Sequence, residues 1–530
     1  MERKKEVTTY LWERLKERKY YFLIAVCLII LYQLGLGVFV SKKVLITLIG
    51  FLVVGIFLLP FDIYEKKRKT EITKFNWISN LGIHNYTCIM ILLFGLLFAY
   101  FAPVYGSPDE NVHGARAIHL VEGHLFIDTN RTARINGIQS IYTQGVDNGE
   151  NLYISQLFDQ PFHVEKEDTI MVNGAKSFPF LSYIPQAIGI AIGDVLGVNA
   201  GIVFLIGRIC NLICYALFIR YAVKIAPAYK GFLSAMGMFP MSVYLGASYN
   251  PEATVTGLGL VTIGYFIRLC YKEEGTIGFR QVGNYLLLCS LMAVVKLPYA
   301  LLIGLLLFLP QKAFSKEIRK NEGDRVQQDK KQYFDGNVVI VKIISVGICG
   351  MVALAWLLYS MHIPDFVHEE YLVTNGVDTI GQLKFALSNV VYSIKVLFFS
   401  SLTYLDTLMR ECFTFGWLTY TLPILPVCYI FVMGGFLVNS QKESKITATM
   451  RMGVGIVAVG IYLTIFAIQF LNWTPVGANQ VLGVQGRYFV LVLALLPLIF
   501  GNSTSKKEKQ ILFTALIFLV LSLIGFFVYF

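Results

Sequence analysis

Charged residues are scarce in this chain. Asp, Glu, Lys and Arg make up only 15% of its 530 residues, whereas hydrophobic residues make up 56%. Soluble domains carry about 25% charged residues, so the composition excludes an ordinary soluble protein. A helix needs roughly 20 apolar residues to cross a membrane, and such runs recur along the sequence. We therefore expect an all-α fold, a polytopic bundle of transmembrane helices.

The sequence also lacks features of other membrane and secreted proteins. None of the nine cysteines falls in the long segment that follows the third apolar run, so neither a disulfide framework nor a cysteine metal site is expected. No small-residue cleavage site follows the first apolar run, which is therefore expected to remain as an anchor. No internal repeat is visible, although transporters often show repeated halves.

About thirteen crossings are expected. Eleven come from the apolar runs 20–40, 44–59, 84–104, 203–223, 231–249, 253–269, 338–360, 415–438, 452–471, 488–500 and 511–530. Segment 283–310 adds two short crossings that turn at Lys296-Leu297-Pro298, where proline forbids a regular helix. Segments 183–196 and 384–402 are expected to lie along the outer membrane surface.

Lysine and arginine predict the orientation, because cytoplasmic segments retain them. Seven basic residues precede Tyr20, so the N-terminus is expected in the cytoplasm. Loop 105–182, which carries five basic and ten acidic residues, is then external. The net charge of +11 follows from this bias and does not indicate nucleic-acid binding.

Three parts are expected within this topology. Residues 1–83 form a cytoplasmic tail and an extra transmembrane hairpin, 84–510 form the transmembrane core with its external loop, and 511–530 form the last crossing.

The most informative motif is Pro108-Asp109-Glu110-Asn111-Val112-His113, at the start of the external loop. Its simpler interpretation is a capping box with Ser107 as N-cap and Pro108 as the first helical residue. The functional interpretation is that Asp109, Glu110 and His113 converge on one helix face, since spacings of three and four allow it. Ionisable groups at a membrane surface suit work on a lipid-carried substrate.

Three cations are expected at the outer ends of their helices: Arg208, Lys296 and Arg487. Each alone could reach toward lipid phosphates. Together, beside an external carboxylate cluster, they predict a pocket for a phosphate or pyrophosphate group. Further polar residues are expected to line it: Glu252, Gln485, Tyr488, Tyr183 and Gln186.

These residues carry a family resemblance. The acidic motif, Tyr183-Ile-Pro-Gln186, Gly207-Arg-Ile-Cys-Asn211 and Gly483-Val-Gln-Gly-Arg-Tyr488 together resemble a family of bacterial membrane proteins of unassigned function. That family is similar to the GT-C glycosyltransferases, and the resemblance extends over about residues 84–500.

The resemblance implies a GT-C-like fold with a large first external loop and membrane-lying helices at 108–122 and 183–196. It implies sugar transfer from a polyprenyl-phosphate carrier on the external face, with Asp109 as the acid of that loop. Two departures stand out: Glu252 occupies a position where aspartate is expected, and no large soluble C-terminal domain follows.

Taken with this resemblance, the sequence predicts an integral protein of a bacterial plasma membrane, an inverting glycosyltransferase of the cell envelope. Asp109 is the expected general base, assisted by Glu110 and His113, and the cations stabilise the leaving phosphate. The expected partners are a polyprenyl-phosphate-linked sugar donor, a glycan or other hydroxyl acceptor, and membrane lipids. No cofactor or metal is predicted, although the carboxylates and His113 could ligate a divalent cation.

Two other functional classes are compatible with the sequence. One is a transporter or flippase for lipid-linked glycans, and the other is a non-catalytic scaffold for envelope assembly.

Overall fold

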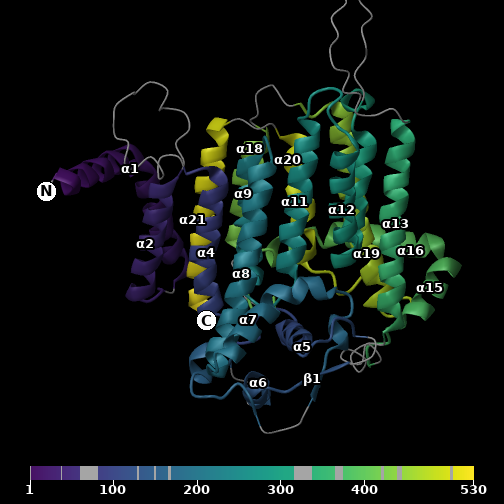
Figure 1. Cartoon of the computed structure of the whole chain (residues 1–530), viewed down its shortest axis with the longest axis horizontal. Helices are drawn as coiled ribbons and strands as arrows, with labels where there is room; N and C mark the ends of the chain where they lie inside the picture. The colour runs from purple at the N-terminus through teal and green to yellow at the C-terminus, as the bar shows by residue number, and fades with distance from the viewer. Residues whose placement is uncertain are drawn as a thin grey trace, which may run out of the picture.

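In the computed structural model most helices run side by side as a bundle, and the segment between α4 (Ile83–Phe101) and α8 (Ala200–Ile225) packs across one end of it (Figure 1). The structure describes residues 2–37, 39–59, 81–127, 131–147, 151–164, 169–314, 337–363, 374–418, 423–438, 445–501 and 505–530. The charged segment 312–335, whose lysines and arginines predict a cytoplasmic loop, lies mostly outside the described residues.

Seven helices in the described ranges are long and apolar enough to cross a membrane. They are α1 (Glu2–Leu36), α4 (Ile83–Phe101), α8 (Ala200–Ile225), α11 (Glu252–Cys270), α13 (Val338–His362), α19 (Ala448–Asn472) and α21 (Ser505–Tyr529). α15 (Thr379–Ser388) and α16 (Val390–Thr403) would add an eighth if the pair were one span. The chain is therefore a helical membrane protein, but the expected thirteen crossings are not confirmed.

Several expected crossings are short. The shorter helices of the bundle are α2 (Lys42–Leu58), α12 (Phe279–Val295), η5 (Leu297–Phe308), α18 (Ile424–Val438), and η7 (Gly486–Phe489) continued by α20 (Val490–Phe500). The predicted crossing at 415–438 was too long, because residues 415–418 are not helical and α18 begins at Ile424.

Two other expected helices are broken. Segment 231–249 divides into α9 (Lys230–Gly237) and α10 (Pro240–Gly246), since Pro240 has no N–H with which to continue the first helix. The predicted surface helix at 384–402 is in fact the α15–α16 pair, which bends by 111°.

The predicted turn at Lys296-Leu297-Pro298 is confirmed. α12 ends at Val295 and η5 begins at Leu297. The two segments pack alongside each other, and the Tyr285 hydroxyl of α12 donates to the Leu302 carbonyl of η5 at 2.7 Å. At their far ends the Ile277 N–H donates to the Ala313 carbonyl in η6 (Gln311–Ala313). Lys296 thus lies at the tip of a helical hairpin.

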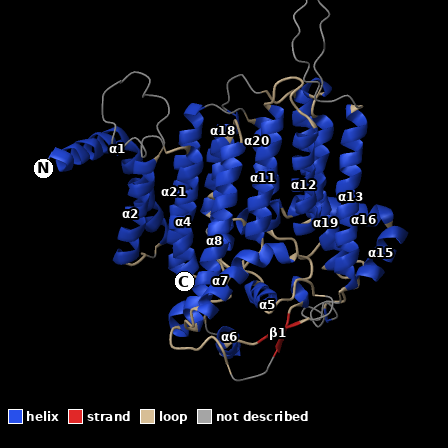
Figure 2. Ribbon diagram, in the orientation of Figure 1, coloured by secondary structure: helices blue, strands red, loops and turns tan. Residues whose placement is uncertain are grey.

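The segment between α4 and α8 contains short elements only. They are α5 (Glu110–Val121), β1 (Thr132–Arg134), α6 (Gly137–Asp147), η2 (Ile154–Leu157), β2 (Thr169–Met171), η3 (Asn173–Ala175), η4 (Phe180–Tyr183) and α7 (Ile184–Val195). β1 and β2 pair antiparallel, with Thr132 opposite Met171 (Figure 2). The expected helices at 108–122 and 183–196 correspond to α5 and α7.

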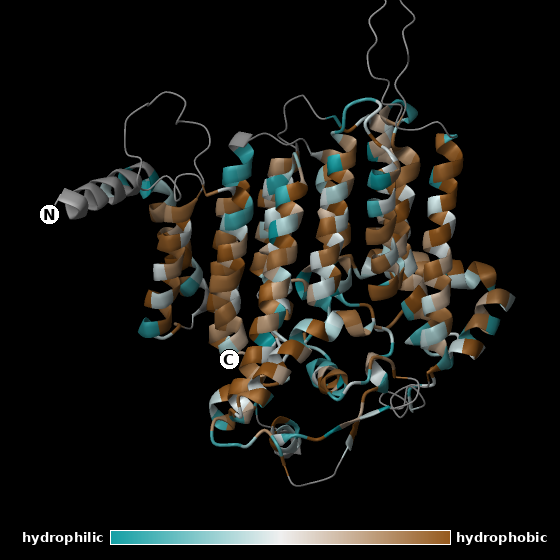
Figure 3. Ribbon diagram, in the orientation of Figure 1, coloured by the Kyte–Doolittle hydropathy of each residue, from teal (hydrophilic) through white to brown (hydrophobic). Residues whose placement is uncertain are grey.

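α8 is the central packing element, in contact with α4, α7 and α11. α7 approaches it closely because both carry glycine: a Cβ at Gly189 would lie 2.6 Å from the Gly207 Cα. In its most apolar stretch α11 is 94% buried inside the protein, whereas the corresponding stretch of α13 is only 17% buried. α13 therefore leaves most of its apolar surface outward, as a lipid-facing helix does (Figure 3).

A fully buried ion pair fastens the end of α4 to α8 and α5. The Arg208 guanidinium donates to Glu110 through Nε at 3.0 Å and Nη2 at 2.9 Å. Its remaining donors bind the carbonyls of Ala99, Ala102 and Pro103. Both side chains are 0% exposed.

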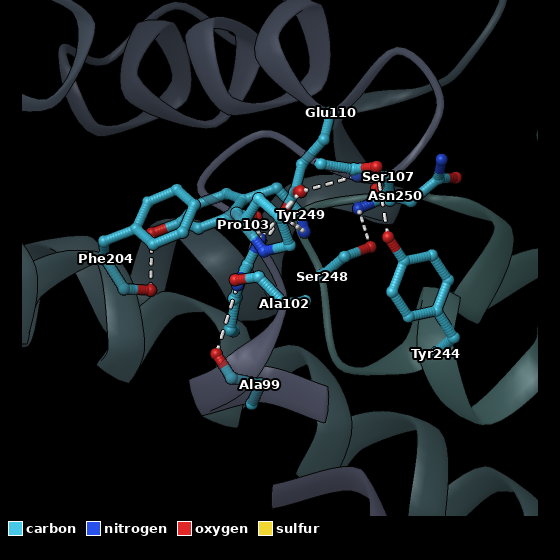
Figure 4. Close-up of polar contacts among 12 residues, drawn as sticks. Ala99, Ala102, Pro103, Ser107, Glu110, Phe204, Tyr244, Ser248, Tyr249 and Asn250 are labelled. Atoms are coloured by element: carbon cyan, nitrogen blue, oxygen red, sulfur yellow. Dashed lines mark hydrogen bonds and ion pairs between the residues drawn. The ribbon is translucent and has the colours of Figure 1, made fainter. Parts of the chain in front are cut away.

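Glu110 also accepts two backbone N–H groups. That of Ser107 lies 3.2 Å from Oε2 and that of Tyr249 lies 3.0 Å from Oε1 (Figure 4). The Glu110 carboxylate and the Arg208 guanidinium are therefore both fully hydrogen-bonded. This is the condition under which two charges can be buried without a prohibitive desolvation cost.

Replacing Arg208 with alanine is expected to destabilise the protein by about 3–5 kcal/mol, because the Glu110 carboxylate would stay buried without its cation. Unfolding of the purified protein by denaturant in detergent measures the loss. The double variant Glu110→Leu/Arg208→Met should recover most of it. Arg268→Ala, which removes an exposed arginine from α11, is the matched control; equal stability of the two single variants would refute the role of the pair.

Candidate functional site

A cavity of about 760 Å³ opens at the end of the bundle that carries α5. Its walls come from the start of α5, the residues after η3, the start of α11, the tip of the α12–η5 hairpin, α13, α19 and η7. Its charged and polar lining includes Asp109, Asn111, His113, Glu252, Lys296, Gln485, Arg487 and Tyr488. Residues far apart in the sequence therefore share one pocket.

Asp109 immediately precedes α5 and forms an ion pair with Arg487. Arg487 Nη2 donates to Asp109 Oδ2 at 2.7 Å, and Nη1 donates to the Pro108 carbonyl at 3.3 Å. The arginine side chain is 4% exposed and the aspartate 35%. The carboxylate thus reaches the cavity while the cation forms part of its wall.

The expected start of the α5 helix was wrong by two residues. Asp109 has φ +60°, a left-handed conformation, and α5 begins at Glu110. Only one half of the capping box forms, since Glu110 accepts the Ser107 N–H while Ser107 Oγ has no hydrogen-bond partner among the described residues. The left-handed turn directs Asp109 and Glu110 to different partners.

A second ion pair lies in the same cavity. Lys296 Nζ is 2.5 Å from Glu252 Oε1, with side chains 19% and 4% exposed. Glu252 is the first residue of α11 and Lys296 is the tip of the hairpin. Asn250 fixes the approach to α11: its Nδ2 donates to the Pro108 carbonyl at 2.8 Å, and its Oδ1 accepts the Glu252 N–H.

The Tyr488 ring contacts the two cations. Lys296 Nζ lies 4.1 Å and the Arg487 guanidinium carbon 5.4 Å from the ring centroid. The Tyr299 hydroxyl donates to the Tyr488 carbonyl, which ties this ring to the hairpin. Cation–π contacts of this kind stabilise partly desolvated charges, so the pocket holds Lys296 and Arg487 near one another.

His113 faces the same cavity from α5. Its Nδ1 and the Tyr183 hydroxyl hydrogen-bond at 2.9 Å. Burial raises the pKa of Tyr183, so that hydroxyl is protonated at neutral pH. Tyr183 itself does not line the cavity, but it orients a residue that does.

Three other predicted site residues lie outside the cavity lining. Glu110 and Arg208 form the buried pair described above, and neither faces the pocket. The expectation that Glu110 converges with Asp109 and His113 was therefore wrong, because Arg208 holds its carboxylate outside the cavity lining. Gln186 is also absent from the lining, and its amide donates to the Tyr249 carbonyl at 3.2 Å.

One carboxylate beside the site was missed by the sequence reasoning. Glu411, the last residue of α17 (Leu405–Glu411), accepts the Gly486 N–H at 2.6 Å. A Cβ at Gly486 would lie 2.4 Å from the Leu408 carbonyl oxygen, so only glycine allows η7 to pack this closely on α17. Burial raises the pKa of Glu411, while this N–H and the charge of Arg487 act in the opposite direction. Glu411 thus helps to place Arg487.

The uncharged wall along α19 and α13 was also missed. It includes Gln469, Asn472, Trp473 and Trp356. Amides and tryptophans at the end of an apolar run have no distinctive spacing, so only the tertiary packing identifies them as cavity residues. Across the described ranges, no group of three His, Cys, Asp or Glu residues is placed to hold a metal ion.

Comparison with known proteins gives a family and no described relative. Residues 92–496 match the model of a family described as "Predicted membrane protein (DUF2142)". Neither the curated proteins nor the solved structures include a match to this chain. Every residue that lines the cavity falls inside the matched segment. Because that segment takes in well over half of the sequence, the chain belongs to the DUF2142 family of predicted membrane proteins.

Proposed function

We propose that this protein is an inverting membrane glycosyltransferase. It moves a sugar from a polyprenyl-phosphate-linked donor to an acceptor hydroxyl on the external face of a bacterial plasma membrane, in the manner of the GT-C enzymes. The observation that carries the proposal is that Asp109 and Arg487 lie 2.7 Å apart in one cavity. Such a transfer needs, within one cavity, a proton acceptor for the attacking hydroxyl and an anion-binding group for the departing phosphate.

In the proposed step Asp109 takes the proton of the acceptor hydroxyl as its oxygen attacks the anomeric carbon. The bond between that carbon and the phosphate oxygen breaks, and the phosphate leaves with the electron pair. Arg487 and Lys296 stabilise the negative charge that grows on the departing phosphate. A single displacement of this kind inverts the anomeric configuration.

The other side chains support this step from fixed positions. Glu252 holds Lys296 at the tip of the hairpin, and His113 lines the same cavity from α5. Glu110 and Arg208 take no direct part, because their pair lies outside the pocket.

The position of the cavity favours this class over transport. Glu252 begins α11, Lys296 follows the end of α12 and Arg487 precedes α20. The cavity also takes residues from the last turns of α13 and α19. The ionic groups thus gather at one end of the long helices, whereas transporters place binding residues on broken helices near the membrane midplane. Chemistry on a substrate with a wet head group and a buried tail suits such a location, and a scaffold has no need of a charged cavity.

Asp109→Asn and Arg487→Ala are each expected to lower sugar transfer by about 100-fold or more, since one removes the base and the other the charge opposite the leaving phosphate. Transfer is measured with purified protein in vesicles, using a panel of radiolabelled polyprenyl-monophosphate hexoses and envelope glycans as acceptors. Asp159→Asn, at an exposed position in the same loop, and Arg268→Ala are the matched controls. Full transfer by both site variants would overturn the assigned roles.

The proposed orientation has its own test. A cysteine at Asp159 should react with a membrane-impermeant maleimide in intact cells, whereas one at Glu274 should react only after lysis. The two positions lie beyond opposite ends of the bundle, since α11 alone spans 19 residues, roughly 28 Å. The background should carry serine at Cys27 and Cys428, the two exposed native cysteines. Labelling of Glu274→Cys alone would place the cavity on the cytoplasmic side.

A further inference from the structure

The cavity has two chemically different parts. Its charged side chains, Asp109, Glu252, Lys296 and Arg487, come from the ends of α5, α11 and α12 and from η7. The wall formed by α19 and α13 contributes no charged residue to the described lining; it consists of amides, aromatic rings and aliphatic groups. A ligand that extends beyond the ionic part therefore meets an uncharged surface with hydrogen-bonding groups.

Gln469 is the central polar group of that surface. The residue is only 9% exposed and lines the cavity from the last turns of α19. Its Oε1 has no hydrogen-bond partner among the described residues. Leaving a buried amide oxygen unsatisfied costs about 1–3 kcal/mol, so a partner from a bound molecule would relieve a real penalty.

Gln485 repeats this arrangement on the facing segment. Its Oε1 is buried and likewise lacks a partner within the described structure, and the residue lines the same cavity. Two amides that each offer an oxygen and an NH₂ group can accept from and donate to hydroxyls at once.

Trp473 and Gly483 complete the subsite. Gly483 has φ +75°, and a Cβ there would lie 2.8 Å from the Trp473 Cβ and 3.4 Å from Gln469 Oε1. Glycine therefore allows this segment to pack directly against Trp473 and Gln469. Trp473 is half-buried and contributes to the lining.

The subsite is held in place before any ligand arrives. Thr474 Oγ1 donates to the Gln469 carbonyl at 3.1 Å and accepts the Leu482 N–H at 3.0 Å, which closes the loop between α19 and η7. The Val481 N–H donates to Ser400 Oγ of α16 at 3.0 Å. Preorganisation of this kind lowers the entropic cost of binding.

We infer that Gln469, Trp473 and Gln485 form a subsite for the ring of an uncharged sugar. Neutral sugars present hydroxyls that both donate and accept, which matches the two amides, and an apolar C–H face that packs on an aromatic ring. A uronic acid would bring a carboxylate into a wall without a cation and would lose its hydration there. The inference rests on the proposed function for its place in the reaction, but the binding itself does not.

Saturation-transfer NMR on the purified full-length protein in nanodiscs tests the inference. The probes are D-glucose, D-galactose, N-acetyl-D-glucosamine and D-glucuronate. At least one neutral sugar should show saturable binding, and glucuronate should show none. Gln469→Leu and Trp473→Phe should weaken that binding by about tenfold, the value of one to two hydrogen bonds or stacking contacts.

Gln311→Leu and Trp12→Phe are the matched controls, since both residues are exposed and neither lines the cavity. Variants are compared only after their unfolding transitions match that of the parent; Gln485→Leu replaces any that fails. The inference is wrong if no neutral sugar binds, if glucuronate binds as tightly, or if the subsite variants bind like the parent.

The transfer assay separates this inference from the proposed function. If Gln469→Leu loses sugar binding while the parent protein shows no sugar transfer, the subsite is supported and the glycosyltransferase is contradicted. If the parent protein transfers sugar, and the KM values for donor and acceptor are unchanged in Gln469→Leu and Trp473→Phe, the glycosyltransferase is supported and the subsite is contradicted. Transfer with a raised KM for one sugar substrate, and with kcat little changed, would support both and show which substrate occupies the subsite.

Discussion

The buried pair of Arg208 and Glu110 is the constraint on which the site depends. Isolated charges at membrane depth are expensive, yet these two satisfy each other and capture three carbonyls and two backbone N–H groups. The carbonyls lie at the C-terminal end of α4, where helix geometry leaves acceptors unpaired. The Arg208 side chain therefore binds the carbonyls at the end of α4, fixes the start of α5 through Glu110, and joins both helices to α8.

This pair also determines where the cavity carboxylates lie. Glu110 binds the Tyr249 N–H, and Asn250 binds the Pro108 carbonyl. The segment before α5 and the segment before α11 are thereby joined, and each continues into a cavity carboxylate, Asp109 in one case and Glu252 in the other. A structural ion pair outside the pocket thus positions two acids inside it.

The ionic part of the cavity is balanced. Asp109 and Glu252 each pair with one cation, and the Tyr488 ring contacts both Arg487 and Lys296. In the proposed reaction a donor phosphate would share these cations with the carboxylates, and Asp109 would be released toward the acceptor as the phosphate takes its place on Arg487. The uncharged wall of α19 and α13 then offers room for a sugar beside this exchange of ion pairs.

The sequence alone determined that this is a helical membrane protein. Apolar runs and prolines act through the local backbone and the solvent, so they predicted most of the long helices, the hairpin tip at Lys296 and the start of α11. Only the tertiary structure decided which charged residues face the cavity. Asp109 and Glu110 are neighbours of the same chemical type, and Arg208 and Arg487 both follow a glycine in an apolar region; side-chain direction alone separates their roles. The same holds for Glu411, Gln469 and Trp473, which act through contacts with segments distant in the sequence.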